Sequence, residues 1–497
     1  MISPISPTAI SNLPPARPLS FLLRVLWGLV SSTISVCASD LPPELAYEFR
    51  GAWVATVYNL DWPSKAGLSS EQQQNELRAI LDRAAALKLN AIIFQVRPQC
   101  DALYASRHEP WSQFLSGRMG RAPEPFYDPL EFAVREAHRR GLELHAWFNP
   151  FRALANAATP ASDNHVTKTH PEWIRRYGTQ LWLDPGEPAA RKYAIEVILD
   201  VVRRYDIDGV HIDDYFYPYP TKDRAPFPDD RPWQQHKTSG GSLARNDWRR
   251  ENINQFVGTL YRAIKVEKRS VKFGISPFGI WRPGVPATIE AQLDAYDQLY
   301  ADARKWLSNG WVDYFSPQLY WSISPAKQSF PVLLDWWRSE NKSGRHLWPG
   351  LGTARIGATR PADEIVAQIS LTRRNNSSPG HIHWSNKSLL RNSGGIADLL
   401  RTGAYADRAL VPPSPWLGGV KPGSPMVKKL GDTATWRLSE NPPRWWLVQT
   451  KTGPAWESRI FPASITALPL KGAEAIAVRA IDRTGLMSEL SEVSIAR

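Results

Sequence analysis

The sequence has almost no cysteine and no motif for a nucleotide-derived cofactor. Its two cysteines, Cys37 and Cys100, are too few for a disulfide framework. No Gly-rich dinucleotide fingerprint follows the first strand-like run, and no phosphate-binding P-loop occurs along the chain. Zinc-finger and RNA-binding signatures are also missing, and Lys and Arg form no long blocks. We therefore expect no cofactor and no nucleic-acid partner.

Near the N-terminus, the apolar run over residues 21–30 is too short for a convincing membrane span. Arg17 and Arg24 precede or interrupt it, and Val36-Cys37-Ala38 is an acceptable small-residue cleavage site. Residues 1–38 are therefore predicted to be a signal peptide of a protein exported to the periplasm or cell envelope. Cys37 raises the alternative of a lipid anchor in the outer membrane, although Val36 is bulkier than a lipobox normally tolerates.

Tryptophan, in contrast, is abundant, with 22 in the chain. Flat amphipathic indole rings are suited to stacking on sugars. The formal net charge of +12 favours an acidic partner, and an acidic cell-wall polymer is one candidate. Composition is thus compatible with a sugar or another flat ligand and with an acidic partner, and does not choose among them.

Strand-like runs alternate with helical stretches over residues 45–408. Eight such runs occur, at residues 49–57, 90–98, 142–150, 209–212, 271–277, 312–320, 346–351 and 380–384. This alternation favours a (β/α)8 TIM barrel over an open doubly wound sheet. After the stiff linker Val411-Pro-Pro-Ser-Pro415, short alternating runs predict a small all-β sandwich over residues 418–497, whose end resembles a fibronectin type III module.

The fourth run, Gly209-Val-His-Ile212, ends in two adjacent carboxylates, Asp213 and Asp214. Strand alternation places Asp213 on the face of His211 and Asp214 on the opposite face. Adjacent carboxylates at the end of a buried strand are costly unless they are paired, solvated or used. Because aromatic residues crowd the same strand end, we favour a working site over a solvated pair that merely caps the strand.

Barrel enzymes build their sites from the carboxyl ends of several strands. Asp213 and Asp214 are the predicted catalytic residues. The predicted substrate-binding residues are Arg97, Trp147, Asn149, Arg152, Tyr215, Trp281, Gln318, Tyr320, Trp321 and Trp384. Structural alternatives stay open: Trp147 and Trp321 could pack the barrel, Arg97 could neutralise Asp213, and Gln318 could satisfy backbone groups. His145 and His211 are expected to satisfy polar neighbours, and no metal site is expected.

Several motifs together resemble the glycosyl-hydrolase-10-like family of bacterial envelope proteins over residues 45–400. They are Arg50-Gly-Ala-Trp53, Gln95-Val-Arg-Pro98, Ala146-Trp-Phe-Asn-Pro150, Leu183-Asp-Pro-Gly186, the segment 208–218, Gly274-Ile-Ser-Pro-Phe-Gly279 and Pro317-Gln-Leu-Tyr-Trp321. The resemblance implies a barrel glycosidase whose strand-four acids match Asp213 and Asp214. The family includes a divisome-associated lipoprotein that hydrolyses peptide-stripped peptidoglycan strands, which implies a role for cell-division partners. A fibronectin-like tail also occurs in relatives.

The expected function is cleavage of peptidoglycan glycan strands at a MurNAc-GlcNAc linkage. Asp213 would act as nucleophile or as orienter of the N-acetyl group, Asp214 as the acid of raised pKa, and Tyr215, Gln318 and Tyr320 would position the sugar. Arg97 or Arg152 would pair with a lactyl carboxylate of muramic acid. The chain departs from the chitinase-type acidic pattern, because His211 and Tyr215 replace its middle acid and final Glu. A non-catalytic glycan-binding protein, or a glycosidase for another polysaccharide, are the alternatives.

Overall fold

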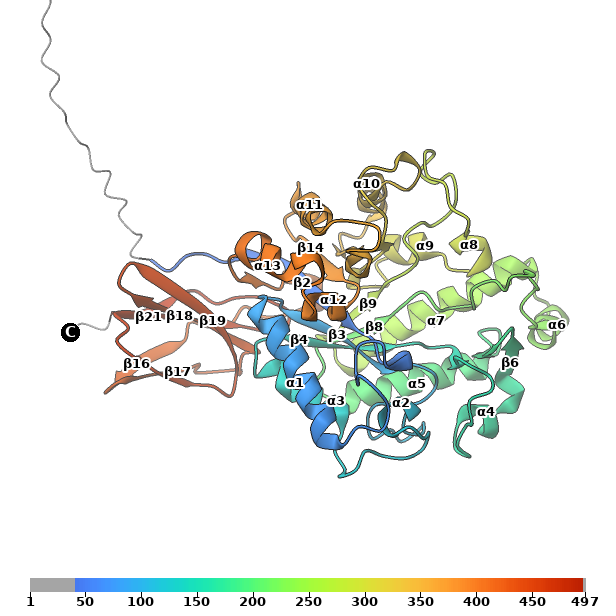
Figure 1. The fold of residues 1–497 in the computed structure, drawn as a ribbon, viewed down its shortest axis with the longest axis horizontal. Helices are drawn as coiled ribbons and strands as arrows, with labels where there is room; N and C mark the ends of the chain where they lie inside the picture. Colours follow the sequence, from blue (N-terminus) through green and yellow to red (C-terminus); the bar gives the residue numbers. More distant parts are fainter. Residues whose placement is uncertain (1–40, 495–497) are drawn as a thin grey trace, which may run out of the picture. The chain divides into compact units, whose positions relative to one another are not determined.

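The computed structural model describes residues 41–494, in which the largest sheet is parallel and has ten strands (Figure 1). The predicted signal peptide and Cys37 lie outside the described residues. Within the part that is described, no helix is long and apolar enough to cross a membrane.

The strands of this sheet coincide with the eight predicted runs. They are β2 (Phe49–Val54), β3 (Ala91–Arg97), β4 (Glu143–Phe148), β8 (Gly209–Ile212), β9 (Lys272–Ile275), β10 (Tyr314–Phe315), β11 (Gln318–Leu319), β12 (His346–Leu347), β13 (Gly350–Leu351) and β14 (Gly380–His383). Neighbouring strands follow the order β11-β13-β14-β2-β3-β4-β8-β9-β10-β12, and every pairing is parallel.

The sixth and seventh predicted strands are each broken in two by a proline. Pro317 separates β10 from β11, and Pro349 separates β12 from β13, because proline has no N–H to donate to a strand ladder. β10 pairs with β12 and β11 pairs with β13, so the two broken strands stay neighbours along their length. β14 in turn pairs with β2. This arrangement is consistent with a TIM barrel.

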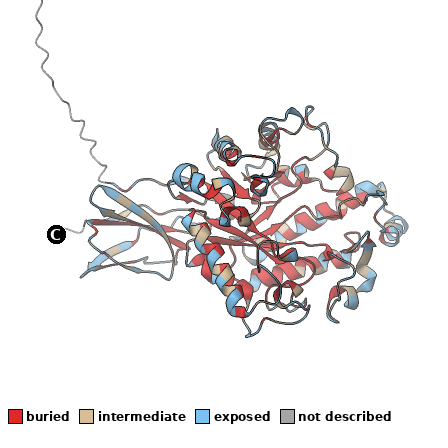
Figure 2. Cartoon of the chain, in the orientation of Figure 1, coloured by how far each residue is buried: buried red, intermediate tan, exposed pale blue. Residues whose placement is uncertain are grey.

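Helices follow the strands and bury one face against the sheet, as the burial colouring in Figure 2 shows. The longer ones are α1 (Ser70–Ala86), α3 (Pro129–His138), α5 (Pro188–Arg204), α7 (Arg245–Glu267), α10 (Phe330–Glu340) and α11 (Ala362–Arg373). In α1 a capping box fixes the start, since the Ser69 side chain accepts from the Gln72 N–H and the Gln72 side chain accepts from the Ser69 N–H.

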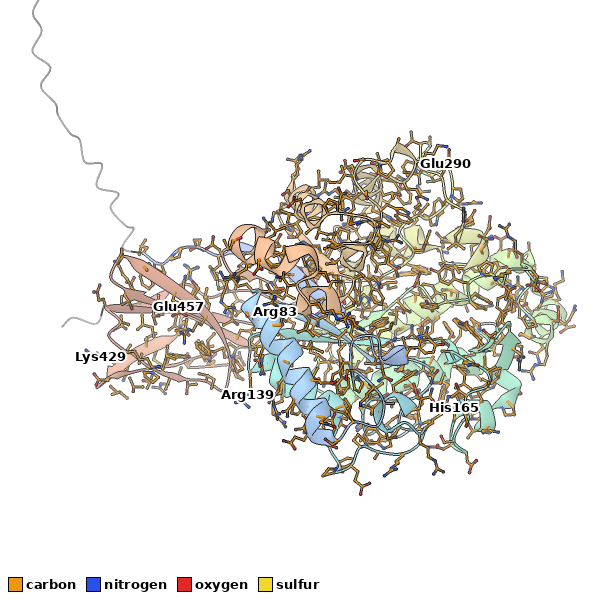
Figure 3. The ribbon with its side chains drawn as sticks, in the orientation of Figure 1. Arg83, Arg139, His165, Glu290, Lys429 and Glu457 are labelled. Carbon is orange, nitrogen blue, oxygen red and sulfur yellow. The ribbon has the colours of Figure 1, made fainter. Side chains whose placement is uncertain are left out.

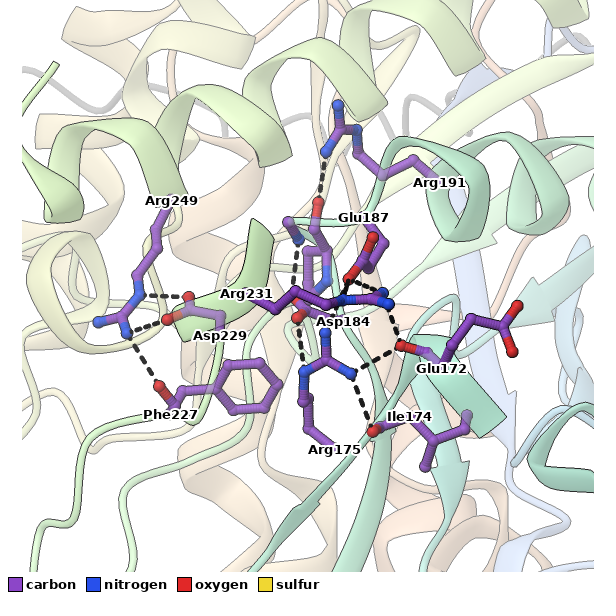
Figure 4. A network of polar contacts seen from close by, with 12 residues as sticks. Glu172, Ile174, Arg175, Asp184, Glu187, Arg191, Phe227, Asp229, Arg231 and Arg249 are labelled. Atoms are coloured by element: carbon purple, nitrogen blue, oxygen red, sulfur yellow. Dashed lines mark hydrogen bonds and ion pairs between the residues drawn. The ribbon is translucent and has the colours of Figure 1, made fainter. Parts of the chain in front are cut away.

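A three-stranded antiparallel sheet interrupts the barrel after β4, where the sequence indicates only a loop. It consists of β5 (Arg152–Leu154), β6 (Ile174–Tyr177) and β7 (Gln180–Leu183). Figure 4 shows the ion-pair network that holds it against neighbouring elements. Arg175 of β6 donates to Glu187, the residue that precedes α5, at 2.7 Å, and Arg231 of α6 (Asp230–Thr238) pairs with the same carboxylate. The network thereby fixes the sheet that carries Arg152.

The C-terminal residues form two antiparallel sheets. One contains β16 (Met426–Leu430), β17 (Thr433–Arg437) and β20 (Ala467–Pro469); the other contains β18 (Trp445–Thr452), β19 (Ala455–Pro462), β21 (Ala475–Ile481) and β22 (Ser491–Ser494). Trp436 of β17 shares a buried core with Trp446 of β18 and Val478 of β21. Charged side chains such as Lys429 and Glu457 are exposed instead (Figure 3). The fold therefore comprises the parallel sheet with its helices and a separate all-β part, as predicted.

Arg444 joins the all-β part to the start of β8. Arg444, which precedes β18, donates through Nη2 to Asp208 Oδ1 at 2.6 Å. The other oxygen of Asp208 accepts from the Leu144 N–H at 2.8 Å and lies 2.9 Å from His138 Nε2. Asp208 directly precedes β8, so this buried contact holds the start of the strand that leads to Asp213.

Candidate active site

A cavity of about 260 Å³ lies at the carboxyl ends of the parallel strands. Residues that follow or end seven of the predicted strands contribute to it, as expected for a barrel. Eight predicted site residues line it: Trp147, Arg152, Asp213, Asp214, Tyr215, Gln318, Tyr320 and Trp384. Six further residues complete the lining: Trp53, Val57, Leu60, Gln95, Tyr219 and Ser276.

Both carboxylates of the predicted pair reach this cavity. Asp213 and Asp214 are each only 4% exposed, and both line the cavity wall. The expectation from strand alternation, that Asp214 would take the opposite face, is wrong. The β8 ladder ends at Ile212, so the chain beyond that residue is no longer held in the alternating geometry of a strand.

A chain of amide side chains holds Asp213 in place. Gln95 Oε1 accepts from the backbone N–H groups of Thr56 and Val57 at 2.8 and 2.9 Å. Gln95 Nε2 then donates to Asn149 Oδ1 at 2.6 Å, and Asn149 Nδ2 donates to Asp213 Oδ2 at 2.5 Å. Since Asn149 Oδ1 also accepts from Arg152, the amide has one sensible orientation. Asn149 is thus buried behind the cavity and acts on Asp213.

Asp214 has a different set of partners. The Tyr219 hydroxyl bonds to Asp214 Oδ2, and the nearby Gln318 side chain acts with it to lower the pKa of this carboxyl. Gln318 Nε2 also donates to the Ser276 carbonyl at 2.9 Å, which fixes the amide across the β9 and β11 strand ends. The predicted alternative for Gln318, satisfaction of a backbone group, therefore coexists with a contact to the acid pair.

Burial raises the pKa of both carboxyls. For Asp213 the pKa is raised to about 7, first by burial and then by repulsion from Asp214, against the opposing effects of Arg152, the Tyr215 N–H and Asn149. Burial also raises the pKa of Asp214, against the hydrogen bonds of Tyr219 and Gln318. A raised pKa therefore does not by itself distinguish Asp214 as the acid. Two neighbouring buried carboxyls disfavour double ionisation, so the pair retains a proton near neutral pH.

Arg152 supplies a cation next to the acid pair. Its Nε donates to the Pro98 carbonyl at 2.9 Å, and its Nη2 donates to Asn149 Oδ1 at 2.8 Å. The guanidinium carbon lies 4.8 Å from the centre of the Tyr215 ring, within cation–π range. Arg152 lines the cavity, and its charge acts to lower the pKa of both Asp213 and Asp214.

Three indoles form an aromatic group in the wall of the cavity. Trp384 packs edge-on against both Trp53 and Trp147, with ring centres 6.1 Å apart in each pair. Trp147 is 5% exposed, and its Nε1 is buried without a hydrogen-bond partner in the described part of the chain. The predicted choice for Trp147 between packing and sugar contact is thus not exclusive, because it packs in the barrel and still borders the cavity.

Three predicted residues lie away from this cavity. Arg97 is fully buried and pairs with Glu109 at 2.6 Å, not with Asp213. Trp281 borders a different groove, beside Tyr296 and Arg304. Trp321 packs edge-on against Phe278, with ring centres 5.6 Å apart. Their strand-end positions in the sequence did not reveal these separate environments.

Tyr219 is the contact that the sequence reasoning missed most clearly. It lies in the proline-rich loop after the acids, where nothing in the sequence distinguishes it from Tyr217, which packs away from this cavity against Phe227 and Tyr300. Trp53 and Gln95 were present in the motifs but were not assigned to the site.

Among the described residues, no group of three or more His, Cys, Asp or Glu is arranged to hold a metal ion.

A family model and curated relatives that match this chain are all described as glycosyl hydrolases. The family model "Glycosyl hydrolase-like 10" matches residues 48–366. Glycosyl hydrolase YngK of Bacillus subtilis (strain 168) is 42% identical over 422 residues, which cover 82% of each chain. Glycosyl hydrolase DigH of Escherichia coli (strain K12) is 35% identical over 353 residues, 66% of this chain and 79% of that protein. The alignment with the solved PgaB (BpsB) glycoside hydrolase domain from Bordetella bronchiseptica covers 71% of this chain and 98% of that domain at 14% identity, with a TM-score of 0.45.

Proposed function

Because the chain belongs to the glycosyl hydrolase-like 10 family, we propose that it is a glycoside hydrolase that cleaves peptide-stripped peptidoglycan strands at a MurNAc-GlcNAc linkage. The observation that carries the proposal is the buried Asp213–Asp214 pair in a cavity walled by tryptophan and tyrosine. Cleavage of a glycosidic bond requires one carboxylic acid and one carboxylate. A coupled pair that keeps one proton provides both.

The hydrogen bonds favour Asp214 as the protonated member. Asp213 accepts from Asn149 Nδ2 and from the Tyr215 N–H, two groups that can only donate in this arrangement. Such donors stabilise an anion. The Tyr219 hydroxyl, by contrast, can donate to ionised Asp214 or accept from its acid form. We therefore assign the leaving-group proton to Asp214, with Asp213 as nucleophile or as orienter of the substrate N-acetyl group.

Arg152 supports a substrate that carries carboxylates. The lactyl groups of muramic acid are anionic, and a guanidinium pairs well with a carboxylate. Arg152 lines the cavity beside the acids, whereas Arg97 is bound to Glu109 and does not border the cavity. Of the two arginines predicted to meet a lactyl group, Arg152 is therefore the one that we propose.

The predicted export segment supports a location in the periplasm or cell envelope. A lipid anchor at Cys37 and association with cell-division proteins are further parts of this proposal, supported by the resemblance described above.

The test is the mass of the products that form when the purified protein is incubated with peptide-free peptidoglycan strands. We expect water-added disaccharide units from the native protein, and a loss of at least about a hundredfold in rate from Asp213→Asn and Asp214→Asn. Asp223→Asn is the matched control, because Asp223 is exposed on the following loop. Anhydro products would show that the protein cleaves the strands by lytic transglycosylation and not by hydrolysis. Binding without products would overturn the proposal in favour of a glycan-binding protein.

Substrate choice is tested separately with Arg152→Gln. If Arg152 meets a lactyl carboxylate, the variant loses roughly tenfold more activity on muramic strands than on chitin oligomers, which lack the carboxylate. An equal loss on both substrates would show that Arg152 acts only through Asn149. Higher native activity on uncharged polysaccharides would favour the alternative of a glycosidase for another glycan.

A further inference from the structure

A line of buried polar side chains runs through the interior of the strand assembly and reaches the cavity through Trp53. Lys272 Nζ lies 2.8 Å from Glu143 Oε1, and Glu143 Oε2 lies 3.0 Å from His145 Nε2. The Tyr314 hydroxyl lies 2.8 Å from His145 Nδ1 and 2.9 Å from His211 Nδ1. His211 Nε2 accepts from Trp53 Nε1 at 3.1 Å. All six side chains are buried, and three of them are completely inaccessible.

The two ends of this line permit one arrangement of protons. A carboxylate only accepts, so His145 carries its hydrogen on Nε2 and donates it to Glu143. Lys272 already balances the single anion, so His145 is neutral and its Nδ1 accepts the Tyr314 hydrogen. The Tyr314 oxygen then accepts from His211 Nδ1–H, which leaves the lone pair of His211 Nε2 for the indole N–H of Trp53, a group that can only donate.

The backbone is adapted to this line of rings. Gly274 faces Tyr314, and a Cβ at that position would lie 2.0 Å from the tyrosine ring. Gly209 faces His145, and a Cβ there would lie 2.6 Å from His145 Nδ1. Any larger residue at either position would displace a member of the line. Two glycines on adjacent strands, β8 and β9, thus make room for it.

We propose that Glu143, His145 and Tyr314 are positioning residues for Trp53 in the sugar-binding cavity. They set the tautomer of His211, and His211 fixes the orientation of the Trp53 indole beside Trp384. With the opposite tautomer, His211 would turn an N–H toward the Trp53 N–H and donate to Ser276 Oγ, which lies 2.9 Å from the same nitrogen. The indole would then lose the acceptor that it has among the described residues. The inference rests on the proposed function in one respect, that the cavity binds sugar.

Tyr314→Phe tests the proposal because it removes the central hydroxyl without adding charge. Nitrogen–proton NMR of the imidazole rings should show that His211 no longer holds a single Nδ1–H tautomer, and the Trp53 indole resonance should shift. Chitotriose, as the probe ligand in calorimetry, should bind about five- to tenfold more weakly, as expected for one lost hydrogen bond. In a Trp53→Phe background, Tyr314→Phe should cause no further weakening.

Tyr405→Phe is the matched control. The Tyr405 hydroxyl is also buried between two histidines, His381 and His383, but these lie on β14 and outside the line. It should leave the His211 tautomer and chitotriose binding unchanged. Glu143→Gln is the second variant if Tyr314→Phe does not fold, and it should also release the tautomer. An unchanged His211 tautomer in the Tyr314 or Glu143 variant, or weakening that persists without the Trp53 indole, would overturn the proposal. The tautomer measurement needs no sugar, so it remains decisive if the proposed function fails.

Discussion

Replacing Glu109 by Gln should destabilise the fold strongly, because it leaves Arg97 charged and buried without its counter-ion. Neither side chain of this pair is exposed to solvent. The contact is bidentate, with Arg97 Nε 2.8 Å from Glu109 Oε2 and Nη2 2.6 Å from Oε1. Removing one partner of a buried pair costs about 3–5 kcal/mol. Among the described residues, the other acceptors of Arg97 are neutral: the Asn149 and Pro150 carbonyls and the Cys100 sulfur.

This cost converts into a measurable change in melting temperature. The unfolding entropy near 60 °C is about 2.1 cal/mol/K per residue, so roughly 450 ordered residues give about 1 kcal/mol/K. Glu109→Gln should therefore lower the melting temperature by about 3–5 °C in a calorimetric scan. Glu124→Gln is the control, since its pair with Arg121 is exposed at 62% and 78% and should contribute at most about 1 kcal/mol.

A double replacement separates ion-pair strain from simple loss of packing. Arg97→Met combined with Glu109→Leu removes both charges, so the double variant should lose less free energy of unfolding than either single variant. Equal melting temperatures for Glu109→Gln and Glu124→Gln would refute the reasoning. So would a double variant whose destabilisation equals the sum of the two single ones.

Three further outcomes are expected. The buried Asp213 and Asp214 carboxyls titrate as a coupled pair, and the pKa of about 7 at Asp213 exceeds the ordinary 3.8. The proton that the pair keeps therefore supports stability fully below pH 4, and this contribution is lost as the pH rises through 7. The melting temperature should fall less between pH 5 and 8.5 in Asp213→Asn, which leaves a single carboxyl, than in the native protein, and parallel curves would contradict this. Gly274→Ala should lower the free energy of unfolding in urea by about 1–3 kcal/mol, because the added Cβ would meet the Tyr314 ring. Gly240→Ala is the control for backbone strain alone, since nothing lies within 4 Å of its Cβ position and its φ is +88°. Trp384→Ala should raise KM for glycan strands about three- to tenfold through lost ring contact, whereas Trp281→Ala should leave KM unchanged, because Trp281 borders another groove.

The strands could be predicted because their apolar runs are nearly continuous. Every residue of β3, from Ala91 to Arg97, is buried, and such runs stand out from the helices between them. The position of the acid pair also followed from the sequence, since strand ends of a barrel converge on one site. The break of β10 from β11 at Pro317 has a visible signal, but its effect on the ladder depends on the neighbouring strand.

The sequence could not predict that Arg97 pairs with Glu109 while Arg152 lines the cavity. Arg97 and Arg152 both follow or end barrel strands, and nothing in their spacing distinguishes them. The distinction comes from Glu109, a residue of an irregular loop whose carboxylate reaches Arg97 only in the folded chain. Asp214 illustrates the same limit, because its orientation depends on where the β8 ladder stops. Distances across loops decide these contacts, and periodicity carries no information about them.

The contact between Arg444 and Asp208 affects how the protein folds while it is being synthesised. The two residues are 236 positions apart, and the arginine is synthesised long after the strand that it supports. A nascent chain that has completed the parallel strands therefore still holds Asp208 without its cation. We expect β8 to reach its final stability only when the C-terminal sheets have been synthesised and folded, so that the last part of the chain to appear completes the support beneath the acid pair.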